Sequence, residues 1–207
     1  MQEIYTIGYA GFKIQDFLKV LKKYQINSLI DVRSNPYSKI YADYNKEALN
    51  QLLQHNKIIY RNYSSEFGAR QSNMEYYPNG YLDFLLFSKS QVFQEGITKI
   101  IRSIPLGFNF VLMCSEKDPI TCHRNIMVAR EFYKKGIEIK NILSDGSYIT
   151  QAEIEKKLVE YYYPNRNQLS FLEADLSWEE MVDNSYKFQN EKIGYHLEDE
   201  VGSVVYG

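Results

Sequence analysis

The sequence contains little cysteine or tryptophan and no long apolar run, and it carries almost no net charge. Its 207 residues include two cysteines and one tryptophan, and its formal net charge at pH 7 is −2. Two cysteines are too few for the disulfide scaffold of a small secreted domain. No apolar run approaches the roughly 18 residues that a membrane-spanning helix needs, and the first residues lack the basic-then-apolar pattern of a signal peptide. We therefore expect a soluble, cytoplasmic protein without a membrane partner.

The net charge and the cysteine spacing also restrict partners and cofactors. A charge of −2 gives no overall positive field that attracts nucleic acid, so nucleic-acid binding would need a local basic patch. Cys114 and Cys122 are separated by seven residues, unlike the spacing of about two to four residues in zinc knuckles, and no second Cys/His pair follows. We therefore expect no metal site and no other cofactor.

Hydrophobic residues make up 44% of the chain, which is enough for a substantial core. Short apolar runs alternate with segments whose apolar residues recur at helical spacing. The expected strands are 4–9, 28–32, 58–60, 110–114 and 137–143, and the expected helices are 13–24, 46–55, 81–87, 92–101, 125–135 and 150–161. This alternation indicates right-handed crossovers and a mainly parallel sheet. The expected fold class is α/β, a three-layer sandwich with a central sheet of about five strands.

The α/β domain is expected to occupy residues 1–163. Thr150 and Glu153 have the spacing of a capping box at the start of its last helix. Residues 164–207 form a polar C-terminal extension with one amphipathic stretch at 178–188, so we expect this extension to be helical or partly disordered. Nothing in the sequence indicates the oligomeric state.

Chemically useful side chains follow the expected strands, and the densest group lies in CSEKDPITCHR, which begins at Cys114. In open α/β sheets, ligands bind outside the carboxyl ends of the strands, where these segments meet. The candidate catalytic residues are Cys114, Glu116 and His123, and the candidate ligand-binding residues are Tyr9, Asp31, Arg33, Glu66, Arg70, Cys122 and Arg124.

The first hypothesis for this edge is an enzyme that binds a phosphate-bearing small molecule or a nucleotide. Arg33 and Arg124 would bind the anion, since guanidinium groups near a helix N-terminus favour phosphate or carboxylate. Glu116, with Glu66 as the alternative, would be the general acid/base or an electrostatic stabiliser, and His123 would orient Glu116 or share its proton. Tyr9 or Tyr37 would stack on a base. The reaction class would be a hydrolase or transferase of glycosidic or phosphate-linked bonds.

The second hypothesis gives the chemistry to Cys114 as a thiolate nucleophile in sulfur transfer or phosphatase action. Glu116, Asp118 and Pro119 count against it, because two of them add negative charge and the third removes a backbone donor. The third hypothesis is a non-catalytic module that binds a nucleotide or nucleic acid through basic, aromatic segments at 57–63 and 161–166.

Purely structural roles are open for the same residues. Asp31 could cap the next turn or pair with a buried arginine such as Arg33, and Glu66 could pair with Arg70 on a solvated loop. A free cysteine in an apolar run, such as Cys114, is more often an inert core residue than a nucleophile. The convergence of many such residues on one edge is what favours a ligand site.

Four ordered motifs, IGYAGF, LIDVRSNPYS, EFGAR and CSEKDPITCHR, resemble those of the domain of unknown function 488 family. The resemblance implies a compact α/β domain over residues 3–160 and carries no established reaction. LIDVR is also similar, more weakly, to the opening of rhodanese domains, in which a later strand ends in a catalytic cysteine. The matching positions are Gly8, Tyr9, Asp31, Arg33, Pro36, Gly68, Cys114, Glu116, Cys122, His123 and Arg124.

Overall fold

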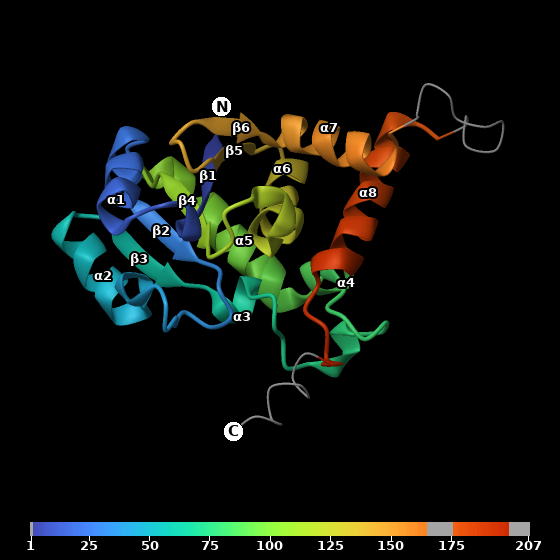
Figure 1. Ribbon diagram of the computed structural model, residues 1–207, viewed down its shortest axis with the longest axis horizontal. Coiled ribbons are helices and arrows are strands. Elements are labelled where there is room, and N and C mark those ends of the chain that lie inside the picture. The colour runs from blue at the N-terminus through green and yellow to red at the C-terminus, as the bar shows by residue number, and fades with distance from the viewer. Residues whose placement is uncertain (1, 165–175, 199–207) are drawn as a thin grey trace.

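The computed structural model describes residues 2–164 and 176–198 and contains a six-stranded sheet between two layers of helices (Figure 1). The strand order is β3-β2-β4-β1-β5-β6, and only the β5–β6 pair is antiparallel among the described strands. The strands are β1 (Glu3–Gly8), β2 (Ser28–Asp31), β3 (Ile59–Asn62), β4 (Phe110–Cys114), β5 (Glu138–Ile142) and β6 (Tyr148–Thr150). The expected α/β fold class and three-layer architecture are therefore confirmed.

Helices cover both faces of this sheet. The longer ones are α1 (Ile14–Lys23), α2 (Lys46–His55), α5 (Gln91–Ser103), α7 (Gln151–Tyr162) and α8 (Trp178–Ile193). The shorter ones are η1 (Tyr9–Gly11), η2 (Ala42–Tyr44), α3 (Ser64–Phe67), η3 (Met74–Tyr76), α4 (Phe84–Ser88), η4 (Ile104–Leu106), η5 (Pro119–Thr121), η6 (Arg124–Ala129) and α6 (Arg130–Lys134). In Figure 1, α1 and α2 lie on one side of the sheet, and α5 and α6 lie on the other.

The alternation of side chains along β4 explains the two cores. Val111 and Met113 pack with the apolar faces of α1 and α2, whereas Phe110, Leu112 and Cys114 pack with those of α5, η6 and α7. Successive residues of a strand point to opposite faces, so a strand covered on both sides is apolar throughout. All five residues of β4 are accordingly buried.

The position of β4 in the sheet brings the candidate residues together. The chain inserts β4 between β1 and β2, so Gly8 at the end of β1 lies beside Cys114, and Asp31 at the end of β2 lies beside Met113. The three carboxyl ends therefore share one edge, as the sequence predicted for parallel strands.

The sixth strand is the main difference from the predicted sheet. β6 follows a turn in which Gly146 has a φ of +77°, and it pairs antiparallel with β5 in the register Asn141↔Ile149. A three-residue strand leaves too short a period-2 pattern to be recognised in a sequence. The capping box of Thr150 and Glu153 follows directly and is confirmed.

Two other segments depart from the expected elements. The stretch expected as one long loop at 62–80 contains α3 and η3, and the helix expected at 125–135 begins as the π-helix η6 before continuing as α6. All six residues of η6 are buried, and a π-helix widens the helical turn. Arg124 and Asn125, the first two residues of η6, are both completely buried.

The helix α8 packs against the rest of the fold. It begins at a capping box formed by Ser177 and Glu180, and it adds Met181, Val182 and Tyr186 to the core that contains η6 and α7. The remainder of the C-terminal extension, 165–175 and 199–207, lies outside the described residues. Within the described part of the chain, no helix combines the length and the hydropathy required to span a bilayer.

A buried polar network joins the sheet to α7 and α8. Asn141 Oδ1 accepts hydrogen bonds from Thr6 Oγ1 at 2.8 Å and from Asn125 Nδ2 at 2.7 Å, and Asn141 Nδ2 donates to Gln151 Oε1 at 3.2 Å. Gln151 Nε2 in turn donates to Tyr186 Oη at 2.7 Å. Buried polar groups of this kind are stabilising only while each keeps its partners.

We expect Asn141→Ala to lower the free energy of unfolding by about 2–4 kcal/mol, because it removes the acceptor of the buried Thr6 hydroxyl and one hydrogen bond each of Asn125 and Gln151, which keep their bond to each other. Urea denaturation measures this loss. Asn50→Ala, an exposed position on α2, is the control and should be neutral or slightly stabilising. Equal stabilities of Asn141→Ala and wild type would contradict this role of the network.

Candidate functional site

A cavity of about 520 Å³ lies at the carboxyl ends of β1, β2 and β4. Its wall is composite: the β2–α2 loop, the segment after α3, the β4–η6 loop and the end of α8 all contribute. The lining consists of Tyr9, residues 33–35, 37–38, 69–70, 114–116 and 192–196, Thr121 and His123.

Four potential metal-binding or proton-transferring side chains converge at this cavity. One donor atom from each of Cys114, Glu116, Cys122 and His123 lies within 4.8 Å of every other. Cys114 Sγ is 3.8 Å from His123 Nδ1, and Cys122 Sγ is 2.9 Å from Glu116 Oε2. Both cysteines are free and buried, whereas Glu116 is exposed at the cavity.

Hydrogen bonds to three backbone carbonyls of the β4–η6 loop hold the loop in a folded-back path. Arg124, which is completely buried, donates from Nη1 to the carbonyl of Glu116 at 2.5 Å and from Nη2 to that of Lys117 at 3.4 Å. The amide of Ala10 donates to the carbonyl of Ser115 at 3.0 Å. These bonds place Cys122 and His123 beside Cys114 despite the seven intervening residues.

Gly8 permits this arrangement because the loop passes directly over it. A Cβ atom at Gly8 would lie 1.8 Å from the carbonyl oxygen of Glu116 and 3.1 Å from Arg124 Nη1. The backbone of Gly8 has a φ of −106°, which any residue can adopt, so space and not backbone conformation requires glycine here.

His123 has a fixed orientation. Its Nε2 lies 2.9 Å from the carbonyl of Val32, which can only accept, so Nε2 carries a hydrogen and Nδ1 faces Cys114. Burial alone would lower the pKa of His123, but Cys122, the Glu116 carboxylate and the Val32 carbonyl raise it above 6.5.

The acid and the thiols have unequal proton affinities. Burial would raise the pKa of Glu116, but the charge of His123 and hydrogen bonds from Cys114 and Cys122 lower it to about 2. Burial and the proximity of Cys122 and Glu116 raise the pKa of Cys114 well above 9.0. Burial opposes ionisation of Cys122 too, yet a hydrogen bond from Cys114, the charge of Arg124 and His123 bring its pKa to about 6.

Arg33 forms the opposite part of the wall and is almost fully buried. Its Nε and Nη2 donate to the two carboxylate oxygens of Asp31 at 2.8 and 2.6 Å, and Nη2 also donates to the carbonyl of Tyr44 at 2.9 Å. Burial alone would lower the pKa of Arg33, but Asp31 raises it above its ordinary value. Nη1 is buried and makes no hydrogen bond of good geometry to the described residues, although the Tyr9 hydroxyl lies close enough to the guanidinium to raise the pKa of Arg33 as well.

Aromatic side chains complete this wall. Tyr9 stacks on Tyr44 with ring centroids 4.4 Å apart, and the Arg33 guanidinium lies 5.1 Å from the Tyr9 ring centroid. Arg70 lies 4.3 Å from the ring centroid of Tyr195, which follows α8. The cavity thus contains guanidinium groups on two sides and a carboxylate at the cysteine cluster.

Six of the ten residues selected from the sequence line this cavity: Tyr9, Arg33, Arg70, Cys114, Glu116 and His123. Cys122 lies behind Glu116 in the cluster, and Asp31 lies behind Arg33 as its ion-pair partner.

Two sequence-based assignments do not fit the geometry. Arg124 is buried beneath the β4–η6 loop and is absent from the cavity wall, so the expectation that it binds the anion is corrected to a structural role. Glu66 packs beside Gly96 of α5, outside the cavity wall, and accepts from Ser65 Oγ at 2.8 Å instead of pairing with Arg70.

The sequence analysis missed the part of the wall made by residues 192–196. This segment returns to the domain, where the amide of Leu82 donates to the carbonyl of Tyr195 at 3.0 Å and His196 forms a bridge with Tyr81. No local sequence pattern showed where the chain after the amphipathic stretch at 178–188 would lie. The spacing argument against a metal site also failed to anticipate the cluster, because it took no account of the folded-back loop.

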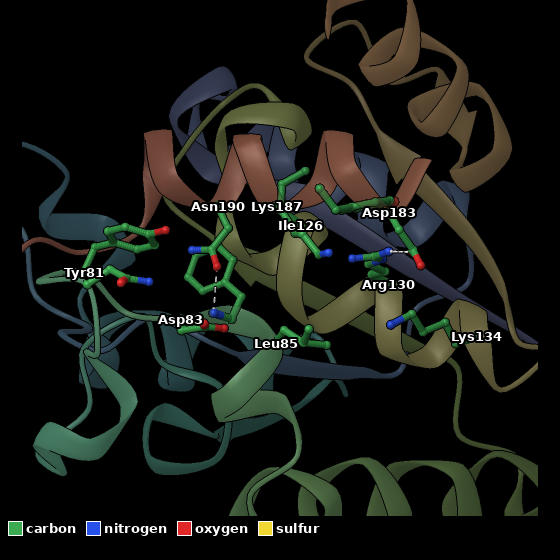
Figure 2. Close-up of a pocket in the computed structure, with 12 residues that line it drawn as sticks. Tyr81, Asp83, Leu85, Ile126, Arg130, Lys134, Asp183, Lys187 and Asn190 are labelled. Atoms are coloured by element: carbon green, nitrogen blue, oxygen red, sulfur yellow. Dashed lines mark hydrogen bonds and ion pairs between the residues drawn. The ribbon is translucent and has the colours of Figure 1, made fainter. Parts of the chain in front are cut away.

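A second cavity of about 280 Å³ lies between α4, α6 and α8 (Figure 2). Arg130 points across it to Asp183, with which it forms an ion pair, and lies 3.7 Å from the ring centroid of Tyr186. Asn190 Oδ1 accepts from the amide of Phe84 at 2.8 Å. Its described lining contains no cysteine or histidine, so the cavity at the sheet edge is the better candidate for chemistry.

We expect Gly8→Ala to destabilise the protein by about 2 kcal/mol or more, because backbone and not a movable side chain occupies the space of the new Cβ. Urea denaturation tests the loss. Gly11→Ala is the comparison, since its Cβ would lie 2.8 Å from the Ser144 side chain, and a smaller loss is expected. A harmless Gly8→Ala would show that the loop does not depend on this close approach.

The pH dependence of stability should report Glu116. Because folding lowers its pKa from 4.5 to about 2, its ionised form stabilises the native state fully above pH 4.5, and this contribution is lost as the pH falls towards 2. The stability difference between wild type and Glu116→Gln should therefore shrink with falling pH, measured by denaturation at successive pH values. Asn50→Ala changes no titratable group and should remain parallel to wild type; parallel profiles for Glu116→Gln would refute the assignment.

A family model described as "Domain of unknown function DUF488" matches residues 13–130, which is more than half of the chain. The matched range contains LIDVR, EFGAR and CSEKDPITCHR, and it ends at the start of α6. No curated protein and no solved structure matches the chain. The resemblance seen in the sequence is thereby confirmed, and the chain belongs to the DUF488 family.

Proposed function

We propose that this protein is an enzyme, a hydrolase or transferase, that acts on a phosphate-bearing small molecule or nucleotide bound in the cavity at the sheet edge. The observation that carries the proposal is the unpartnered Nη1 of Arg33. Leaving a buried donor without an acceptor costs free energy, and an anionic oxygen entering the cavity would supply that acceptor. Asp31 fixes the guanidinium plane in advance, so binding would need little reorganisation.

The acid–base role falls to Glu116. Its low pKa keeps it ionised at neutral pH, and it lines the same cavity as Arg33. A pKa of about 2 makes it a weak base, so the support for this role is its position beside the guanidinium site, where a carboxylate can orient water or a substrate hydroxyl and stabilise positive charge. His123, oriented by Val32, would stabilise the charge of Glu116.

Cysteine chemistry is the alternative, and the two thiols differ in their fitness for it. Cys114 lines the cavity, but its pKa is raised, so it is a poor thiolate. Cys122 has a pKa of about 6, but it is buried behind Glu116. These observations favour Glu116, and sulfur transfer or phosphatase action remains the second proposal.

A non-catalytic nucleic-acid module has less support. In the segment 57–63, Tyr60 is buried and its hydroxyl donates to Asp31 at 2.7 Å, so it is not available to stack on a base. In the segment 161–166, residues 165 and 166 lie outside the described part of the chain. Localisation in the cytoplasm likewise stays a proposal.

The test is binding and turnover of inorganic phosphate, nucleotides and sugar phosphates. Arg33→Lys, which cannot offer the same fork of donors, should weaken anion binding by about tenfold, and Glu116→Gln should bind substrate but not convert it. Titration calorimetry and product analysis measure the two effects.

Lys134→Met, in the second cavity (Figure 2), is the control and should behave as wild type. Arg33→Lys binding as tightly as wild type, or Glu116→Gln retaining full turnover, would overturn the corresponding role. Salt-dependent binding of oligonucleotides without turnover of any small molecule would favour the non-catalytic module instead.

A further inference from the structure

We propose that Cys114, Cys122 and His123 form a binding site for a divalent transition metal, Zn²⁺ in the first place, whose fourth coordination position opens to the cavity beside Glu116. This inference is independent of the proposed reaction, because the metal would be held by protein side chains alone. Two thiolates, an imidazole and an open position make up a donor set typical of catalytic zinc.

The spacing of the donors fits tetrahedral coordination. Zinc–sulfur and zinc–nitrogen bonds of about 2.3 and 2.0–2.1 Å place neighbouring S and N ligands about 3.6 Å apart. Cys114 Sγ and His123 Nδ1 are separated by 3.8 Å, and all donor atoms of the cluster lie within 4.8 Å of one another. Small side-chain adjustments therefore suffice to complete the site.

The histidine already has the hydrogen bonding of a metal ligand. Its Nε2 donates to the carbonyl of Val32 at 2.9 Å, which leaves Nδ1 directed at Cys114. Ligating histidines characteristically donate their second ring nitrogen to a carbonyl or carboxylate, which fixes both tautomer and ring orientation. A histidine that only filled space in the core would need no such alignment with two thiols.

The surroundings hold the donors before any ion arrives. The bonds from Arg124 and Ala10 to the β4–η6 loop fix the distance between Cys114 at the end of β4 and the Cys122–His123 pair. Cys114 and His123 both line the cavity, so an ion has an entry path. Two thiolates also neutralise a divalent ion, which allows the centre to be buried.

Glu116 is assigned the position next to the metal and not a place among its ligands. In the metal-free cluster its Oε2 accepts a hydrogen bond from Cys122 Sγ at 2.9 Å, which is shorter than the spacing of neighbouring ligands on one zinc ion. Metal binding would release the protons of both thiols to solvent and end this bond, which frees the carboxylate for another donor. From there, the carboxylate could accept a hydrogen bond from water in the fourth position.

The experiment measures metal content and cobalt spectra of the purified full chain, without any substrate. We expect about one equivalent of bound metal after incubation with Zn²⁺ and gel filtration, and a sulfur-to-metal charge-transfer band after incubation with Co²⁺. Because the chain has no cysteine besides Cys114 and Cys122, such a band can arise only there.

Cys114→Ser, Cys122→Ser and His123→Gln should each lower the bound metal at least tenfold. His55→Gln, an exposed histidine on α2, is the matched control, and both it and Glu116→Gln should retain the metal. Each variant is checked for folding by circular dichroism. If a cysteine variant does not fold, the cobalt spectrum of wild type and the metal content of His123→Gln test the proposal instead.

Wild type without stoichiometric metal and without a cobalt band would overturn the proposal, as would full metal retention by folded Cys114→Ser and Cys122→Ser. Loss of metal in Glu116→Gln would overturn the open fourth position. None of these results depends on anion binding, so failure of the metal site and failure of the proposed reaction are separately visible.

Discussion

The arrangement of the cysteine cluster depends on the close approach of the β4–η6 loop to Gly8 at the end of β1. The carbonyl of Glu116 sits over Gly8 where a Cβ would be, and Arg124, buried without a carboxylate partner among the described residues, donates to that carbonyl. A buried guanidinium is costly unless its donors are used, and Nη1 and Nη2 bind two consecutive carbonyls, whereas Nε is buried without a hydrogen-bond partner among the described residues. This contact and the bond from His123 Nε2 to the carbonyl of Val32 together hold Cys122 and His123 beside Cys114.

The sequence predicted the fold well where periodicity was strong. The helix expected at 46–55 coincides with α2, and the strand expected at 110–114 coincides with β4, because both have an unambiguous apolar pattern. The strand β6 was missed because three residues carry almost no pattern, and η6 was taken for an ordinary α-helix because a π-turn has no recognised signature here. The backbone conformations of β6 and η6 depend on tertiary packing, which a local sequence pattern does not show.

The site was predicted as a group of residues but not as a geometry. Because the strands are parallel, Tyr9, Arg33 and Cys114, which lie at or just after strand ends, were expected at the same edge of the sheet. The structure places all three on the cavity wall. Arg124 was expected at the ligand, and the structure places it outside the cavity wall, because an arginine near a helix start is equally compatible with a ligand site and with a buried carbonyl partner. The meeting of Cys114 with Cys122 and His123 could not be read from spacing, since it depends on a loop path set by Gly8.

The two halves of the cavity come from different stretches of the chain. The cysteine cluster and Arg33 lie within the segment shared with the DUF488 family, whereas residues 192–196 lie well beyond residue 130. The two parts of the wall are therefore encoded separately, so substitutions in residues 192–196 can change the shape of the cavity while leaving the cysteine cluster and Arg33 untouched. In the enzyme that we propose, such modular encoding would give natural variation a route to new substrates.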